Sequence, residues 1–192
     1  SSGAVTTSRN TSLEYRFSAS WQRCWMEPGP NSNTIVNNLI STLAPQTDQV
    51  IIVLNTPGFG GCARGNSLAV TLGANWTVFA HELGHMFGQQ GDEYQCNSGS
   101  GTCGAYSGAE PGAINLTINT SRSSVDWSEW IPSWRPVPTS SSQVSDLSQD
   151  VGIFAGGTLG SGQWWTGIYR PSFRGRMHGN SPPHTPVGYT SV

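Results

Sequence analysis

The sequence has no lysine, and charged residues account for only 10% of its 192 positions. All nine basic residues are arginines, and the formal net charge is −2. A nucleic-acid-binding protein needs a dense basic surface, whereas the tightest basic group here is Arg170, Arg174 and Arg176. Three charges are too few for that purpose, so we expect no nucleic-acid partner.

Long apolar runs are also missing. No stretch reaches the roughly 18 apolar residues that a membrane span requires, and the first residues, SSGAVTTS, have no signal-peptide pattern. We therefore expect no membrane span and interpret the chain as a mature or excised domain. Glycine (24) and proline (12) predict many turns, yet 35% hydrophobic residues and eight tryptophans indicate a globular core.

The four cysteines contain no CxxC pair, which argues against a zinc-ribbon site. An even number of cysteines in a lysine-free chain rich in serine, threonine and glycine favours an oxidising compartment, and hence secretion. We predict two disulfides, Cys24 with Cys62 and Cys96 with Cys103, each adding about 2–4 kcal/mol to stability. Four asparagines fit the N-x-[ST] pattern for glycosylation in a eukaryotic secretory pathway: Asn10, Asn75, Asn115 and Asn119.

The first half of the chain alternates helical and strand patterns. Apolar residues at helical spacing before Pro45 predict a helix over residues 31–44, and the run QVIIVL predicts a buried strand over 49–54. The other expected elements are strands at residues 13–19 and 68–72, a glycine-rich loop at 56–67, and a helix from 74 to about 89.

The second half of the chain shows no regular pattern after Gly91, and residues 95–150 are rich in glycine, serine, proline and tryptophan. We therefore predict one catalytic domain over residues 1–192, with an upper helix–strand lobe (1–90) and a lower loop-rich lobe (91–192). The predicted fold class is α/β, in the α+β sense.

The segment HELGHMFGQQGDEY, residues 81–94, contains the residues suited to catalysis. His81 and His85 are four residues apart and therefore point the same way from a helix. The apolar stripe of that helix should face the core and leave the two imidazoles roughly opposite its centre. The stripe consists of Trp76, Phe79, Ala80, Leu83, Met86 and Phe87.

Two histidines with this spacing can bind one zinc ion in a tetrahedral site, with Glu82 beside the metal as general base. A third protein ligand is needed. If Gly88 ends the helix with a positive φ, Asp92 can return to the metal, and we prefer it to its neighbour Glu93.

An HExxH pattern also occurs by chance on ordinary helices. Here the helical context, a glycine near the expected helix end and a carboxylate pair directly after it favour a metal site. His178 and His184 are alternative ligands, but both lie far along the chain in a tail rich in glycine and proline, where a surface histidine is the commoner interpretation.

HELGHMFGQQGDEY resembles the signature of the IgA-peptidase family of metallopeptidases, HExGH followed by DEY at the same offset. The resemblance continues in DQVIIVLNTPGFGGCARG, AEPGAINLT, WSEWIPSWRPVPT and GIYRPSFRGRM, and so covers roughly residues 48–179. It implies a metzincin-like fold, with a twisted sheet and helices above the zinc and a methionine turn at Met177. One departure is that Gly91 stands where the usual metzincin pattern HExxHxxGxxH has its third histidine.

These features predict a secreted, monomeric, zinc-dependent endopeptidase with one catalytic Zn²⁺ and a protein or glycoprotein substrate. Glu82 would deprotonate a zinc-bound water and later protonate the leaving amine, and Tyr169 would stabilise the oxyanion. Tyr94 is a weaker candidate for the same role. Five tryptophans could stack on sugars of a glycoprotein: Trp127, Trp130, Trp134, Trp164 and Trp165. We expect most of them to lie in the core instead.

Two other functions fit the same residues. One is a catalytically silent module that binds glycans or protein, for which an intact Glu82 would have no use. The other is a zinc amidase that acts on cell-wall material. Specificity for immunoglobulin A does not follow from the resemblance, because a shared fold does not determine the substrate.

Overall fold

A computed structural model of the chain describes residues 12–17, 26–65, 67–94, 96, 104–160, 162–180 and 182–190. The chain forms two compact units, Ser1–Met86 and Phe87–Val192, which are treated separately below. Among the described residues, no helix combines the length and the apolar character needed to cross a membrane.

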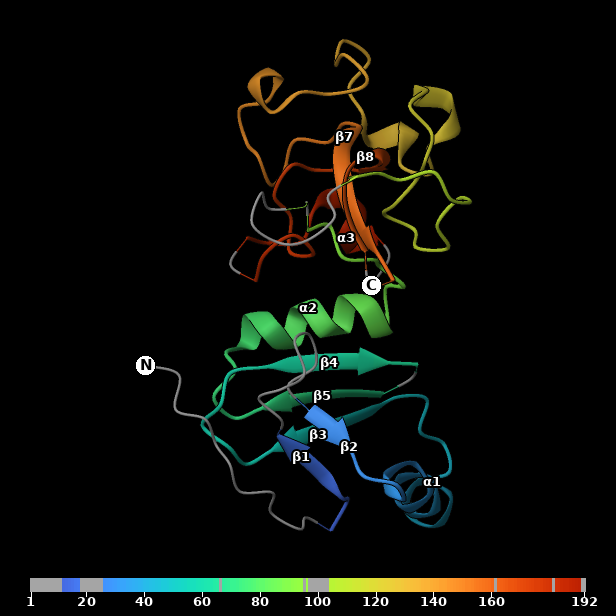
Figure 1. Cartoon of the computed structure of the whole chain (residues 1–192), viewed down its shortest axis with the longest axis vertical. Helices are drawn as coiled ribbons and strands as arrows, with labels where there is room; N and C mark the ends of the chain where they lie inside the picture. Colours follow the sequence, from blue (N-terminus) through green and yellow to red (C-terminus); the bar gives the residue numbers. More distant parts are fainter. Residues whose placement is uncertain are drawn as a thin grey trace. The chain divides into compact units, whose positions relative to one another are not determined.

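The first unit is built around a three-stranded sheet with the strand order β3-β5-β4 (Figure 1). Strand β3 pairs in parallel with β5, and β4 pairs antiparallel with β5 on its other side. A short antiparallel pair, β1 and β2, precedes them. The elements are β1 (Tyr15–Phe17), β2 (Met26–Pro28), α1 (Ser32–Leu43), β3 (Val50–Leu54), β4 (Gly61–Arg64), β5 (Ser67–Thr71) and α2 (Trp76–Met86).

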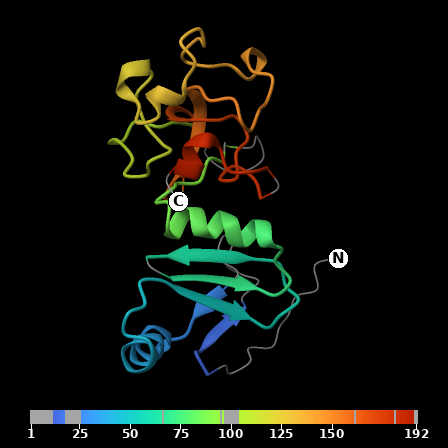
Figure 2. The same cartoon turned by 180° about the vertical axis from the view of Figure 1, so that it is seen from behind.

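The two helices of this unit cover opposite faces of the sheet (Figure 2). Successive side chains of a strand point to opposite faces, so each face receives alternate residues. One face buries Val36 of α1 with Ile52, Leu54 and Ala69. The other face buries Met86 of α2 with side chains of β5, and α2 lies against β4 and β5 (Figure 1).

Most of the predicted elements of this unit are confirmed to within one to three residues, but the glycine-rich loop is partly wrong. Residues 61–64 form strand β4, whose backbone pairs with β5 from Gly61↔Val70 to Arg64↔Ser67. The segment GCAR has no β-branched or alternating apolar residues, so its strand state comes from the neighbouring strand rather than from its own propensity.

The apolar stripe of α2 is confirmed only at its centre. Phe79, Leu83 and Met86 pack on the sheet, whereas the end residues Trp76 and Phe87 are 70% and 51% exposed. The sheet therefore covers the middle of the apolar stripe but neither of its end residues.

The second unit contains a β-hairpin that the sequence analysis missed. Strand β7 (Phe154–Leu159) pairs antiparallel with β8 (Gly162–Arg170), with a register irregularity between Ala155 and Gly157. Strand β8 also pairs in parallel with β6 (Gly104–Ala105). The remaining elements are the 3-10 turns η1 (Arg122–Ser124), η2 (Ser128–Trp130) and η3 (Ser141–Gln143), and the helix α3 (Pro186–Thr190).

The glycines of this hairpin interrupt the sequence pattern by which strands are recognised. Gly156, Gly160 and Gly167 have φ angles of 97°, 61° and 80°, which interrupt the alternation of a regular strand. At Gly167 a Cβ would lie 2.1 Å from the carbonyl oxygen of Tyr106, so no side chain fits between β8 and the segment beside it.

The core of the second unit is centred on Trp127. This residue is 1% exposed and clusters with Val125, Ile131, Val151, Ile153 and Val187, and its indole Nε1 donates to the Gly152 carbonyl at 2.8 Å. Trp127 therefore cannot stack on a sugar. Trp134, by contrast, is 71% exposed, and the guanidinium of Arg135 lies 4.6 Å from the centroid of its ring.

Two of the four cysteines lie among the described residues. Cys62 and Cys96 are disulfide-bonded, and neither is a free thiol. The partners that we predicted for them, Cys24 and Cys103, lie outside the described residues, so the pairing stays a prediction.

The structure is thus that of a mixed α/β protein with small sheets and few helices. The division into an upper lobe (1–90) and a lower lobe (91–192) stays a prediction.

Candidate metal centre

Helix α2 presents the two histidines of the HExxH pattern. It begins at Trp76 rather than at residue 74, because the side-chain oxygen of Asn75 accepts hydrogen bonds from the backbone N–H groups of Thr77 and Val78, at 3.1 and 3.4 Å. The helix ends at Met86.

The chain reverses after α2 at Gln89. This residue has a φ of 50°, the left-handed conformation that we expected of Gly88. The side chain of Gln89 is exposed and therefore meets no packing constraint, and its carbonyl accepts a hydrogen bond from the N–H of Ile114 at 3.4 Å. The expectation for Gly88 is wrong, although the reversal itself occurs within one residue of the predicted place.

The segment from His81 to Asp92 brings three potential ligand atoms together. The Nε2 atoms of His81 and His85 are 3.1 Å apart, with ring planes at 85°. One ligand atom from each of these residues and from Asp92 lies within 4.8 Å of the others. Two nitrogens bound to one tetrahedral ion at about 2.0–2.1 Å would be roughly 3.3 Å apart, so the two imidazoles fit a shared metal ion.

The carboxylates of Asp92 and Glu93 have different surroundings. Asp92 belongs to the three-residue group, whereas Glu93 is 1% exposed and its Oε1 accepts a hydrogen bond from Asn115 Nδ2 at 2.9 Å. This geometry agrees with the preference for Asp92 over Glu93 as the third ligand, which remains a prediction.

His178 and His184 do not join the group among the described residues. The ring of His178 lies 6.4 Å from that of Tyr94, and His184 packs edge-on against Tyr189. Burial, with the positive charges of Arg170 and Arg174, lowers the pKa of His178 to about 4. The imidazole of His178 is therefore neutral near pH 7.

Glu82, the predicted general base, is buried on α2 with 8% of its surface exposed. Strand β4 approaches the helix at Gly61. A Cβ on Gly61 would lie 2.6 Å from Val78 Cγ1, 2.8 Å from Glu82 Cγ and 3.0 Å from Glu82 Oε1. Residue 61 therefore has no room for a side chain while Glu82 keeps this position.

We expect Gly61→Ala to displace Glu82 and Val78. Overpacking of this kind costs about 1–3 kcal/mol of stability. The activity of the folded protein should also fall, because Glu82 is the predicted base. Thermal unfolding and steady-state kinetics measure the two effects. The control is Gly112→Ala, since a Cβ on Gly112 meets no atom within 4 Å; equal activities of the two variants would contradict the prediction.

Two other predicted site residues lie in the second unit. Met177 is 2% exposed and lies in a tight turn in which the N–H groups of His178 and Gly179 both donate to the Gly175 carbonyl. Tyr169 lies on β8 and packs partly against the cluster around Trp127. The roles of Met177 as a floor beneath the metal and of Tyr169 at the oxyanion stay predictions.

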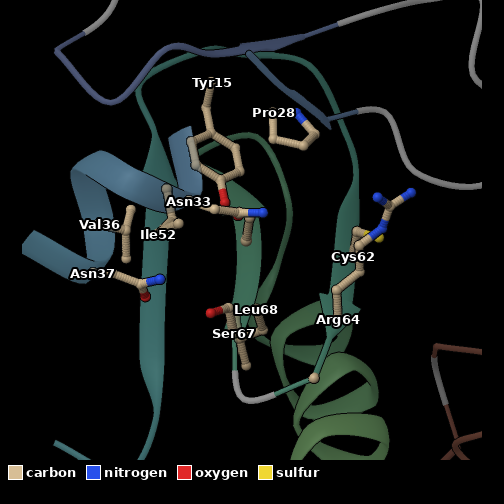
Figure 3. A pocket seen from close by; sticks show the side chains of 12 residues that line it. Tyr15, Pro28, Asn33, Val36, Asn37, Ile52, Cys62, Arg64, Ser67 and Leu68 are labelled. Carbon is tan, nitrogen blue, oxygen red and sulfur yellow. The ribbon is translucent and has the colours of Figure 1, made fainter. Parts of the chain in front are cut away.

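The first unit also contains a cavity of about 370 Å³ on the α1 side of the sheet. Tyr15 points into it from β1, facing Asn33 of α1 and Arg64 of β4 (Figure 3). Burial raises the pKa of Tyr15, and the charge of Arg64 opposes that shift. The described residues that line the cavity include no carboxylate or imidazole.

Comparison with known protein families supports the interpretation of the His81–Asp92 segment as a peptidase site. A family model described as IgA Peptidase M64 matches residues 9–150, well over half of the chain and including His81, His85 and Asp92. The chain belongs to the IgA peptidase M64 family. The resemblance described above is therefore confirmed, although its last segment, GIYRPSFRGRM, lies beyond the matched residues. A search of curated proteins found no match.

The proteins of the IgA peptidase M64 family are metallopeptidases. His81, His85 and Asp92 could hold the metal ion.

Proposed function

We propose that this chain is a secreted zinc-dependent endopeptidase that cleaves proteins or glycoproteins. The observation that carries the proposal is the convergence of His81, His85 and Asp92, with ligand atoms within 4.8 Å of one another, in a member of a peptidase family. Secretion is supported by the absence of lysine and by the two described cysteines, which are not free thiols. We also propose a monomer, with Cys24 paired to Cys62 and Cys96 to Cys103.

The donor set is the reason to propose zinc. Two imidazole nitrogens and one carboxylate oxygen match the three-ligand set of catalytic zinc sites, whereas calcium and magnesium prefer oxygen ligands alone. When bound, zinc supplies Lewis acidity, which polarises a carbonyl group and makes water more acidic.

The residues of the chain would move the protons. Glu82 follows His81 directly and lies on α2 close to Gly61 of β4. In the proposed mechanism its carboxylate accepts a proton from the attacking water. The same carboxylate then returns the proton to the leaving amine. Tyr169 would donate a hydrogen bond to the oxyanion. A metzincin-like arrangement, with the turn at Met177 as a hydrophobic floor, is part of this proposal.

Removal of metal tests the proposal directly. We expect the purified protein to contain about one zinc ion per chain and to cleave unfolded casein. Treatment with 1,10-phenanthroline should abolish cleavage, because the water-activating ion is withdrawn, and added Zn²⁺ should restore it. The measurements are metal analysis of the protein and peptide release from casein.

The same assay separates the rival functions. Cleavage of casein that withstands full removal of metal would refute zinc catalysis. Activity on peptidoglycan but not on casein would indicate an amidase, and metal binding without either activity would indicate a silent binding module. Mapping of cleavage sites in a protein mixture would then define the substrate class.

A further inference from the structure

The backbone around Asp92 is fixed by three hydrogen bonds to two distant parts of the second unit, strand β7 and the turn at Met177. The carbonyl of Asp92 accepts from the N–H of Thr158 on β7 at 3.0 Å. The hydroxyl of Thr158 donates to the carbonyl of Tyr94 at 2.9 Å. The N–H of Glu93 donates to the carbonyl of Met177 at 2.8 Å. A segment with no helix or strand of its own is therefore held at three successive residues.

One side chain, Asn115, contacts the residues on both sides of Asp92. Its Oδ1 accepts from the N–H of Gly91 at 2.7 Å, and its Nδ2 donates to the carbonyl of Gly91 at 3.0 Å. The same Nδ2 donates to Glu93 Oε1 at 2.9 Å. Asn115 is 1% exposed, so its amide group is committed to these bonds. N-glycosylation, which the N-x-[ST] pattern allowed at this position, does not fit such a residue.

We propose that Asn115 is a positioning residue for the metal ligand Asp92: its carboxamide holds Gly91 and Glu93 and thereby fixes the orientation of the residue between them. This inference rests on the proposed function, because it takes Asp92 as a ligand. A carboxamide suits the task because it offers an acceptor and a two-hydrogen donor in one plane.

The side chain of Glu93, the neighbour of Asp92, is also held in place. Glu93 is 1% exposed. Burial lowers the pKa of Arg170 to about 10, and the negative charge of Glu93 opposes this shift. Arg170 is itself anchored, because its guanidinium donates to the carbonyls of Ala155, Gly156 and Phe173. The Glu93 side chain is thus held by Asn115 and attracted by Arg170, and Asp92 alone of the carboxylate pair joins the histidines.

The same contacts explain why residue 91 is glycine. A Cβ on Gly91 would lie 2.5 Å from Leu116 Cδ1 and 3.0 Å from Ala113 Cβ, since the segment around Asn115 passes directly beside it. No side chain fits at position 91, and a histidine ligand at that place in the chain is therefore excluded. The packing of Ala113 and Leu116 against Gly91 agrees with a ligand that comes one residue later.

The test compares Asn115→Ala with Asn119→Ala in the full-length chain. Asn119 is a matched control, because it also forms side-chain hydrogen bonds, to Glu110 and Thr117, but none to residues 91–93. Zn²⁺ affinity is measured by competition with a chromophoric chelator, and ligand geometry by the visible absorption of the Co²⁺-substituted protein. Thermal unfolding of the metal-free proteins monitors the fold. Asn115→Ser, which replaces the carboxamide with a hydroxyl that can still donate or accept a hydrogen bond, is the milder second variant.

We expect Asn115→Ala to bind Zn²⁺ about 10–100-fold more weakly than the wild type and to have an altered Co²⁺ spectrum. Asn119→Ala should match the wild type in both. An Asn115→Ala protein with wild-type affinity and spectrum would overturn this inference and leave the proposed function intact. Failure of both Asn115 variants to fold without metal would also overturn it, since Asn115 would then act on folding. A wild type that binds neither metal would instead refute the proposed function.

Discussion

Glu82→Gln should lower kcat for peptide hydrolysis by roughly 10²–10⁴-fold, the usual contribution of a general base, while the protein keeps its bound zinc. The amide has nearly the same shape as the carboxylate and fits the same space beside Gly61, but it cannot accept a proton from water. Metal analysis and steady-state kinetics on a peptide substrate provide the two measurements. The affinity for zinc should change little, because Glu82 is not a member of the ligand group.

The matched control is Glu129→Gln. Glu129 is exposed on a 3-10 turn of the second unit, so its loss of charge should leave kcat unchanged. A Glu82→Gln enzyme with wild-type kcat would rule out Glu82 as the base. Loss of zinc from this variant would show instead that Glu82 supports the metal, and the proposed division of roles on α2 would then be wrong.

His81→Ala should abolish both metal binding and peptidase activity. Removal of one imidazole leaves His85 and Asp92, which are too few ligands to hold catalytic zinc tightly at neutral pH. His81 is also 4% exposed, so the substitution opens a small cavity and should lower stability modestly. The measurements are zinc content after dialysis, casein cleavage, and thermal unfolding with and without Zn²⁺.

The control for His81→Ala is His184→Ala, which removes a histidine outside the three-residue group. This variant should retain zinc and activity. Zinc binding should also raise the unfolding temperature of the wild type but not of His81→Ala, because only the wild type gains the free energy of metal binding. Full zinc occupancy in folded His81→Ala would contradict the assignment of His81 as a ligand.

Much of the first unit could be predicted from local pattern. Helices α1 and α2 and strands β3 and β5 have continuous or periodic apolar residues, and each lies within a few residues of its predicted position. The strand β4 and the hairpin of β7 and β8 could not be predicted in this way. Their segments are rich in glycine and small residues, and their pairing depends on strands that lie elsewhere in the chain.

The candidate site also has a part that local sequence predicts and a part that depends on distant residues. Helical geometry alone brings His81 and His85 to one side of α2, because residues four apart lie one turn from each other. The choice between Asp92 and Glu93 depends on non-local contacts. Asn115, Thr158 and Met177 hold residues 91–94, and no spacing in the sequence connects those three residues with one another.

The amino-acid sequence by itself therefore determined the HExxH helix, the family and the class of reaction to expect, because these depend on residues close together in the chain. Only the tertiary structure decided the surroundings of each carboxylate and the need for glycine at positions 61 and 91. The physical reason is that hydrogen-bond partners and steric limits at these positions come from residues 17 or more positions away, whose approach depends on the packing of the whole unit.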